Sequence, residues 1–230
     1  MSSIDLSIVL SGEFGGWLLR GLLLSIELTL ITLVFAFPLA TAVALLRLSP
    51  YSSLRALGFA FVEGIRNVPL LVHFLFWYFG APQLLPEGAR DWLNEHNAEA
   101  VCAVVALTLY TAAFMAEDVR SGIRSIPSAQ LEAARALGFS YLRSMRLLVL
   151  PQAVRVTVPP LISQTLSLWK NTSIATVIGT AELMYQAQRV ETATFRGVET
   201  FAVATLAYLA VSFVITAIGT LYQRRFPVRT

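Results

Sequence analysis

Long apolar stretches separated by short charged segments form the main pattern of this chain. Four stretches carry few charged side chains: residues 17–46, 57–79, 98–115 and 201–222. A fifth, residues 147–169, is more polar and contains Pro151, Pro159 and Pro160. A helix that crosses a membrane needs about 20 mostly apolar residues, and it tolerates prolines where neighbouring helices satisfy the freed carbonyls. The pattern therefore predicts an all-α integral membrane protein with five transmembrane helices.

The arginines predict how these helices are oriented, because cytoplasmic loops of membrane proteins carry an excess of Lys and Arg. Arg47 and Arg55 flank the first connection, whereas the second, residues 81–97, has three acidic side chains against Arg90 alone. The third is rich in arginine: Arg120, Arg124, Arg135, Arg143, Arg146 and Arg155. The tail carries Arg224, Arg225 and Arg229. We expect the N-terminus outside, and the third connection and the C-terminus in the cytoplasm.

Composition supports a membrane protein and narrows its chemistry. Of the 230 residues, 56% are hydrophobic and only 13% are charged, against about a quarter charged in soluble domains. The net charge is +3, but the arginines lie mainly in the predicted cytoplasmic connections, so nucleic-acid binding is not expected. Cys102 is the only cysteine, which excludes internal disulfides and cysteine-based metal clusters. The N-terminal residues lack the basic region of a cleaved signal peptide, and no metal or cofactor site is expected.

The cytoplasmic connection at about residues 124–150 has the local signals of an ordered element. Ser125 and Ser128 offer hydroxyl caps beside Pro127, and residues 129–137 are expected to form a helix. Gly138 suits the left-handed position that ends many helices, and Ser140 can cap a second short helix. Two short helices joined by a glycine bend are therefore predicted at the cytoplasmic surface.

The spacing of these residues resembles the EAA loop of ABC-importer permeases. The matching residues are Glu132-Ala133-Ala134, Gly138 and the sequence Leu148-Val149-Leu150-Pro151. In that family the loop forms coupling helices that dock on the ATP-hydrolysing subunit. The resemblance therefore implies an ATPase contact made by Glu132, Ala133, Ala134, Arg135, Gly138, Leu150 and Pro151.

Further motifs resemble the polar amino-acid permeases within that family. They are Gly21 with Ser25 and Leu28-Thr29, residues 66–72, residues 116–123, and Lys170-Asn171-Thr172-Ser173. Ser25 and Ala129 depart from the family, which usually has threonine and glycine there. The resemblance covers residues 21–225 and implies one permease domain over residues 1–230, with its core at about 17–225, in the fold of type I ABC-importer permeases.

The resemblance also implies partners and a substrate class. An ABC ATPase dimer would supply ATP hydrolysis with its own ATP and Mg, and a second permease subunit, identical or homologous, would complete the path. A periplasmic or lipid-anchored binding protein would deliver a polar amino acid, with glutamate/aspartate or glutamine favoured. The location implied is the bacterial inner membrane, surrounded by lipid.

Polar groups at membrane depth are candidates for the substrate path, because burying them there is costly. They are Arg66, Asn67, Lys170, Asn171, Thr172, Ser173 and Glu182. An amino acid is a zwitterion, so Lys170 to Ser173 could hold its carboxylate and Glu182 its ammonium group. Two alternatives stay open: Arg66 and Glu63, one turn apart, pair with each other or anchor neighbouring helices, and Lys170 extends to the outer interface beside Trp169. His73 is expected to be a satisfied polar group among aromatic side chains.

Other classes of protein have less support in the sequence. The phosphate-binding motif of ATPases does not occur, so this chain is not expected to hydrolyse ATP. A carrier driven by an ion gradient could use Glu27, Glu63 and Arg66, but it predicts inverted repeats that are not visible. A membrane enzyme would need a catalytic constellation that the sequence lacks.

Overall fold

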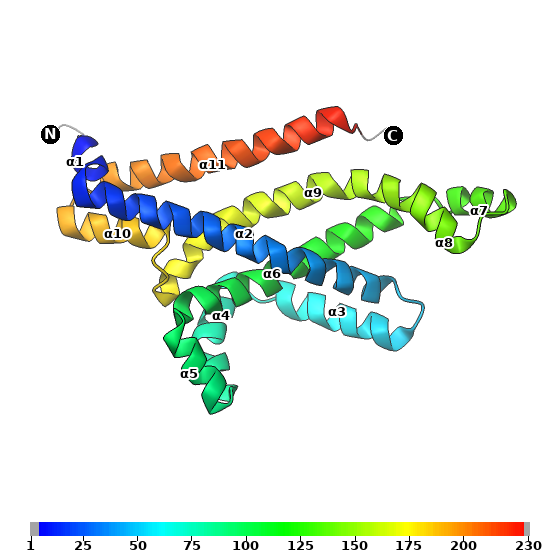
Figure 1. Cartoon of the computed structure of the whole chain (residues 1–230), viewed down its shortest axis with the longest axis horizontal. Coiled ribbons are helices and arrows are strands. Elements are labelled where there is room, and N and C mark those ends of the chain that lie inside the picture. The colour runs from blue at the N-terminus through cyan, green and yellow to red at the C-terminus, as the bar shows by residue number, and fades with distance from the viewer. Residues whose placement is uncertain (1–4, 228–230) are drawn as a thin grey trace.

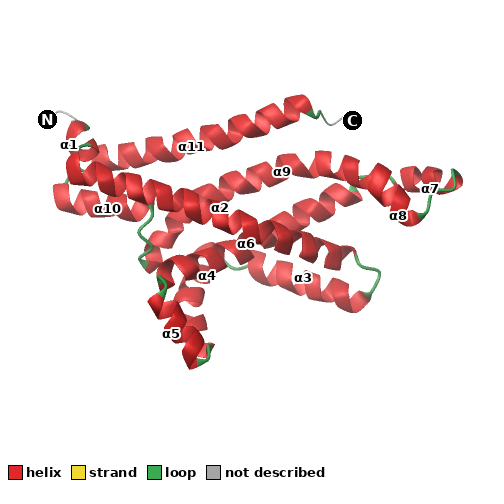
Figure 2. Ribbon diagram, in the orientation of Figure 1, coloured by secondary structure: helices red, strands yellow, loops and turns green. Residues whose placement is uncertain are grey.

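The computed structural model describes residues 5–227, and the regular elements within this range are helices (Figures 1 and 2). The α-helices are α1 Ser7–Leu10, α2 Gly12–Leu48, α3 Ser52–Arg66, α4 Leu70–Leu75, α5 Glu87–Glu95, α6 Ala98–Arg124, α7 Ser128–Ala136, α8 Tyr141–Ser144, α9 Leu150–Asn171, α10 Leu183–Thr194 and α11 Gly197–Arg225. π-Helical turns follow α4 (Phe76–Gly80) and α8 (Met145–Val149), and 3-10 turns span Ala81–Leu84 and Thr172–Ile178. Arg229, assigned above to the cytoplasmic tail, lies outside the described residues.

The described residues contain four continuous helices that are long and apolar enough to cross a membrane. These are Gly12–Leu48, Ala98–Arg124, Tyr141–Ile178 and Gly197–Arg225, and the bent pair α3–α4 makes a fifth if it is counted as one span. The predicted all-helical membrane fold is confirmed. Two spans were predicted too short: α6 continues for nine residues beyond residue 115, and the fourth span begins before residue 147.

The second predicted span is not one straight helix. The helix axis bends by 99° between Ser52–Arg66 and Leu70–Leu84, with the break at Asn67–Pro69. Pro69 is extended (ψ 140°), and proline also disfavours helical geometry in the residue before it. The His73 ring lies 3.1 Å from the Ile65 carbonyl oxygen across the break, while the Asn67 amide donates to the Glu63 carbonyl at 2.9 Å. The groups freed by the break are therefore partly satisfied by side chains.

Small residues allow the long helices to approach one another closely. Ala36, Ala40 and Ala44 of α2 are buried in one cluster with Ala112 and Ala116 of α6. In membranes, small side chains at helix contacts permit this close packing. Gly122 of α6 lies against α9 so closely that a Cβ there would overlap the Thr157 hydroxyl. The α2–α6–α9 packing forms the frame that positions the remaining elements.

Helix α11 packs along one edge of this frame (Figure 1). An apolar cleft remains beside it. The cleft has a volume of about 610 Å³ and lies between α2, α9 and α11, where Leu33, Ile162 and Val214 line it. Two contacts fix the helix: Gly219 meets Ile162, and the Trp169 indole donates to the Tyr208 carbonyl oxygen at 3.1 Å. Most large side chains of α11 are exposed, as expected of a helix that faces lipid.

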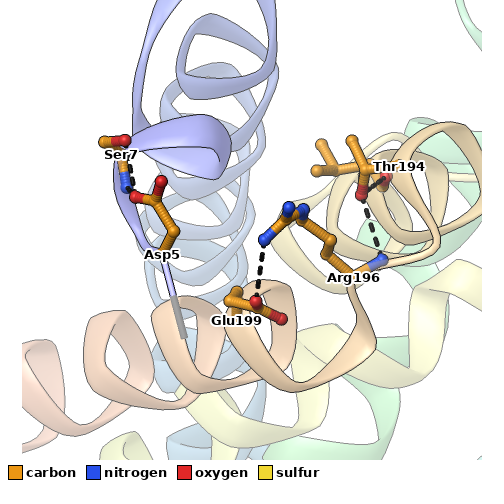
Figure 3. A network of polar contacts seen from close by, with 6 residues as sticks. Asp5, Ser7, Thr194, Arg196 and Glu199 are labelled. Carbon is orange, nitrogen blue, oxygen red and sulfur yellow. Dashed lines mark hydrogen bonds and ion pairs between the residues drawn. The ribbon is translucent and has the colours of Figure 1, made fainter. Parts of the chain in front are cut away.

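The end of the molecule that contains α1 and α10 carries a short polar network (Figure 3). The Arg196 guanidinium pairs with Glu199 at 3.1 Å, and the Arg196 amide donates to the Thr194 hydroxyl at 3.3 Å. Nearby, the Ser7 hydroxyl and amide donate to Asp5, and these bonds lower the pKa of the Asp5 carboxyl. The opposite end of the molecule contains α7 and α8 (Figure 1).

Candidate functional site

The predicted coupling loop forms two short helices joined at Gly138. Helix α7 ends in a left-handed turn in which Gly138 has a φ of 81°. The Gly138 amide donates to the Arg135 carbonyl at 2.9 Å, and the Phe139 amide to the Ala134 carbonyl at 3.0 Å. These two bonds close a helix C-terminus in the arrangement that favours glycine. Ser140 then caps α8 by accepting from the Arg143 amide, as the sequence predicted.

The start of this loop differs from the prediction. Pro127 occupies the N-cap of α7 and no side chain caps it, so the expected hydroxyl cap is wrong. The Ser125 hydroxyl instead donates back to the Gly122 carbonyl at the end of α6, at 2.8 Å. A side-chain bond between Gln152 and Gln130 ties α9 to α7 and fixes the loop against the long helix.

The surface around Gly138 is apolar, basic and exposed. Helices α7 and α8 form one tip of the molecule (Figure 1), and Leu137 and Leu142 of this helix pair are 77% and 79% exposed. Glu132, Ala133, Arg135, Leu150 and Pro151 are also exposed, whereas Ala134 is buried. Large exposed apolar patches with a polar rim mark sites of protein contact. Of the residues assigned to ATPase contact, Ala134 instead packs inside the loop.

Arg66 and Asn67 lie at the broken end of α3. The Arg66 guanidinium lies over the Phe114 ring, 4.8 Å from its centroid, and the Glu63 carboxylate accepts from the Asn67 amide at 3.1 Å. The predicted Glu63–Arg66 pair is thus replaced by these two contacts. The guanidinium remains exposed on its other side, where an anionic group could reach it.

The segment Lys170 to Ser173 ends α9 and begins the 3-10 turn. Thr172 is buried and its hydroxyl donates to the Trp169 carbonyl at 2.8 Å, while the Ser173 hydroxyl donates to the Lys170 carbonyl at 2.7 Å. The structure therefore uses both hydroxyls to satisfy the backbone where the helix changes geometry. Lys170 is exposed, and Asn171 lines a polar cavity.

Glu182 is fully buried and already has four partners. Its carboxylate accepts from the amides of Met184 and Tyr185 and from the Tyr208 hydroxyl, each at 2.9 Å. The Ser25 hydroxyl lies 3.3 Å away. Burial raises the pKa of the Glu182 carboxyl above its ordinary value, against the effect of these bonds. The carboxylate thus caps α10 and joins it to α2 and α11.

A polar cavity of about 380 Å³ lies between α6 and α9. Tyr110, Phe114, Gln164, Ser167 and Asn171 line it. It joins two of the predicted regions, because Asn171 contributes directly and Phe114 carries the Arg66 guanidinium on its ring. The cavity offers amide, hydroxyl and aromatic groups in a space of the size that a small polar molecule needs.

Sequence reasoning missed Tyr110, Gln164 and Asp118. Gln164 of α9 donates its amide to Asp118 of α6 at 2.9 Å, although the two residues are 46 positions apart. Asp118 belongs to the motif at residues 116–123, and Gln164 is a polar residue inside an apolar stretch. Both could therefore have been chosen as candidates from the sequence. Their pairing depends on how α6 and α9 cross. Among residues 5–227, no group of three His, Cys, Asp or Glu side chains is placed to hold a metal ion.

Comparisons with known proteins agree with the loop and the fold. The family model described as "Binding-protein-dependent transport system inner membrane component" matches residues 21–227. The chain belongs to this family. As an inner-membrane, multi-pass transport component it works in a binding-protein-dependent ABC system, whose ATPase is a separate subunit and whose binding protein is another partner. This decides against the carrier driven by an ion gradient.

Two relatives and one solved structure are similar to this chain over most of its length. The chain is 40% identical over 197 residues to the probable glutamine ABC transporter permease protein GlnM of Bacillus subtilis, an alignment that covers 86% of this chain and 87% of the relative. It is 36% identical over 214 residues to the glutamate/aspartate import permease protein GltJ of Escherichia coli, covering 91% and 87%. An amino acid ABC transporter solved with histidines has a TM-score of 0.85 and 27% identity, covering 98% of this chain and 100% of that one. The predicted resemblance to polar amino-acid permeases is confirmed.

Proposed function

We propose that this chain pairs with a second permease subunit, identical or homologous, to form the path of an ATP-driven importer of glutamine or glutamate/aspartate. The names of GlnM and GltJ support these substrates. A single permease domain, with its core at about residues 17–225, forms one half of the path. The α7–α8 end faces the cytoplasm, and the α1–α10 end faces the binding protein, whether periplasmic or lipid-anchored. The arginine-rich third connection supports this orientation.

The loop around Gly138 docks on the ATPase dimer. The observation that carries this proposal is the exposed, glycine-bent helix pair at the tip of the molecule, with Leu137 and Leu142 pointing to solvent. Glu132, Ala133 and Arg135 present the polar part of the same surface, while buried Ala134 lets α7 pack closely on its own loop. Leu150 and Pro151 connect this surface to α9, so movement of the ATPases reaches the transmembrane helix.

The polar cavity between α6 and α9 forms part of the substrate path. The Arg66 guanidinium suits the substrate carboxylate, and Asn171 adds an amide at the other wall. Because the amide nitrogen of Gln164 donates to Asp118, the amide oxygen remains for the substrate ammonium group. Asn67 and Lys170 flank this route, whereas Thr172, Ser173 and Glu182 support the backbone around it.

The coupling role is tested by changing the conformation of Gly138 alone. A β-branched residue is strained at a φ of 81°, by about 1–2 kcal/mol, whereas asparagine accepts this region more readily. Apart from Gly138 and its two chain neighbours, no described residue has an atom within 4 Å of the position of an added Cβ, so the change acts through the backbone. We expect Gly138→Val to reduce co-purification of the ATPase and Gly138→Asn to reduce it less.

The same preparations then test the substrate. Proteoliposomes that contain the permease, the second permease subunit with which it co-purifies, its ATPase and its binding protein are supplied with ATP and labelled glutamine, glutamate or aspartate. We expect uptake of at least one of the three by the unmodified protein and reduced uptake by Gly138→Val. Full co-purification and full uptake by Gly138→Val would remove the coupling role, and uptake of none of the three would remove the proposed substrates.

A further inference from the structure

Three arginines line one pocket where α2 ends and α3 turns back. The pocket has a volume of about 410 Å³ and is lined by Arg47, Arg55 and Arg120 together with Ser52, Ala56 and Phe59. Ser52 is the first residue of α3, so amide groups without an intrahelical partner begin at the same place. Arginine groups and the start of a helix both favour an anion with several oxygen atoms.

One carboxylate holds two of these arginines in place without cancelling their charge. Glu117 of α6 pairs with Arg47 at 2.8 Å and with Arg120 at 3.0 Å. Arg55 donates instead to the carbonyls of Ser49 and Pro50, each at 3.1 Å. Three guanidinium groups against one carboxylate leave a net charge of +2. The Arg120 Nε is buried and has no partner among the described residues, which indicates a missing acceptor.

The position of Arg47 is fixed by the close approach of α3. A Cβ on Gly58 would lie 2.8 Å from Arg47 Cγ and 3.2 Å from the Arg47 amide nitrogen, so only glycine fits there. The Arg47 guanidinium lies over the Phe59 ring, 5.3 Å from its centroid. Phe59 is itself 54% exposed, so the pocket has an apolar wall next to its charged groups. The pocket therefore suits a ligand that has a charged group next to an apolar group.

The pocket lies at the level of lipid headgroups. Residues 21–46 of α2 contain Glu27 as their one charged side chain, and Arg47 follows directly. At 1.5 Å per residue these 26 residues extend about 39 Å, slightly more than the hydrocarbon thickness of about 30 Å. This length places Arg47 at the membrane interface, and the nearby apolar side chains of Leu45 and Leu57 are exposed.

We propose that the pocket formed by Arg47, Arg55 and Arg120 binds the phosphate of an anionic phospholipid headgroup. The guanidinium groups contact the phosphate oxygens, Glu117 keeps Arg47 and Arg120 oriented, and Phe59 lies against the upper part of the acyl chains. Basic pockets between transmembrane helices at the cytoplasmic interface are suited to anionic headgroups. Assignment of the pocket to the cytoplasmic leaflet rests on the orientation proposed above. The preference for one lipid headgroup can be measured without knowing that orientation.

The purified permease–ATPase complex, exchanged into phosphatidylglycerol or phosphatidylcholine, tests this site by native mass spectrometry of the lipids it retains. We expect preferential retention of phosphatidylglycerol and an about five-fold loss of that retention in Arg120→Gln. Glu117→Gln, which raises the positive charge of the pocket, should retain at least as much as the unmodified complex. Arg224→Gln removes an exposed arginine outside the pocket and should change nothing. If Arg120→Gln does not fold, Arg55→Gln replaces it with the Glu117 pairs intact.

Four outcomes would overturn the proposal. The first is equal retention of the two lipids, and the second is an equal loss of phosphatidylglycerol retention in Arg120→Gln and Arg224→Gln. The third is displacement of the lipid by millimolar inorganic phosphate. The fourth is an Arg120→Gln variant that loses ATPase binding but keeps its lipid. The third would assign the pocket to free phosphate, and the fourth to a protein contact.

Discussion

At the residue scale, the buried carboxylate of Glu182 shows how one side chain can join three helices. It caps α10, accepts from Tyr208 of α11 and lies beside Ser25 of α2. Gly21, one turn before Ser25, lies so close to α10 that an added Cβ would be 2.9 Å from Leu183 Cα. A charged group in an apolar sequence therefore serves the contact between helices, because each acceptor site has a donor.

Glu182→Ala is predicted to lower the stability of the protein rather than change its substrate. The substitution leaves two amides at the start of α10 and the Tyr208 hydroxyl without their acceptor, at a cost of about 2–4 kcal/mol. The thermal unfolding midpoint in detergent should fall. Glu182→Gln keeps one acceptor oxygen, so its unfolding midpoint should fall less. Lys170→Ala alters an exposed side chain and should leave the midpoint unchanged. An unchanged midpoint with lost uptake in Glu182→Ala would return Glu182 to the substrate path.

At the scale of the elements, local signals were sufficient for the glycine bend of the coupling loop and insufficient for the start of that loop and for the break between α3 and α4. Gly138 and Ser140 act within a few residues of themselves, so the sequence predicted the bend between α7 and α8. Pro69 favours a break in the helix, but it does not determine an angle of 99°, which depends on where α4 packs. Leu70 and Phe74 of α4 are buried in the cluster that contains Ala175 and Ile178, more than 100 residues later.

The polar cavity was unpredictable for the same reason. Its walls come from α6 and α9, and no pattern within either helix states which faces meet. Gly122 and Thr157 determine that crossing, yet each is unremarkable in its own segment. The sequence was therefore informative about groups that act locally and uninformative about contacts between distant helices.

Gly122→Ala is predicted to separate α6 from α9. The added Cβ would overlap the Thr157 hydroxyl and lie 3.1 Å from Thr157 Cβ, so the helices must shift. Overpacking of this kind costs about 1–3 kcal/mol. The unfolding midpoint should fall in Gly122→Ala and recover in part in the double variant with Thr157→Ala, which removes the nearest atom. Gly64→Ala is the control, because no described atom outside its own helix turn lies within 4 Å of the added group. Equal effects at the two glycines would contradict the close crossing.

At the scale of the whole molecule, the two ends of the bundle differ in chemistry. One end carries α1 and α10, and the other carries α7 and α8 (Figure 1). The arginine pocket lies where α2 ends and α3 begins. Helix α5 projects from the side of the bundle with Arg90 among acidic side chains. The described part of α11 ends at the opposite end from α1, which agrees with an odd number of membrane crossings.

The orientation predicts opposite labelling of two introduced cysteines. In a Cys102→Ala background, Ala89→Cys places a thiol on exposed α5 and Ala136→Cys places one on exposed α7. A maleimide that does not cross the inner membrane should label the first in intact cells and the second only after permeabilisation. The reverse pattern would invert the topology. The Cys102→Ala chain alone measures the background.

The crossing of α6 and α9 has a mechanical consequence for the long helical span Tyr141–Ile178, which has 38 residues. Thr157 divides this span into arms of roughly 24 Å and roughly 32 Å at 1.5 Å per residue. A tilt of about 5° around the Gly122–Thr157 contact moves the ends of the two arms by about 2 Å and about 3 Å in opposite directions. The contact acts as the fulcrum of a lever. A push on α7 would then reach Asn171 at the polar cavity, about 21 Å beyond Thr157, reversed in direction and slightly reduced, without any helix having to unwind.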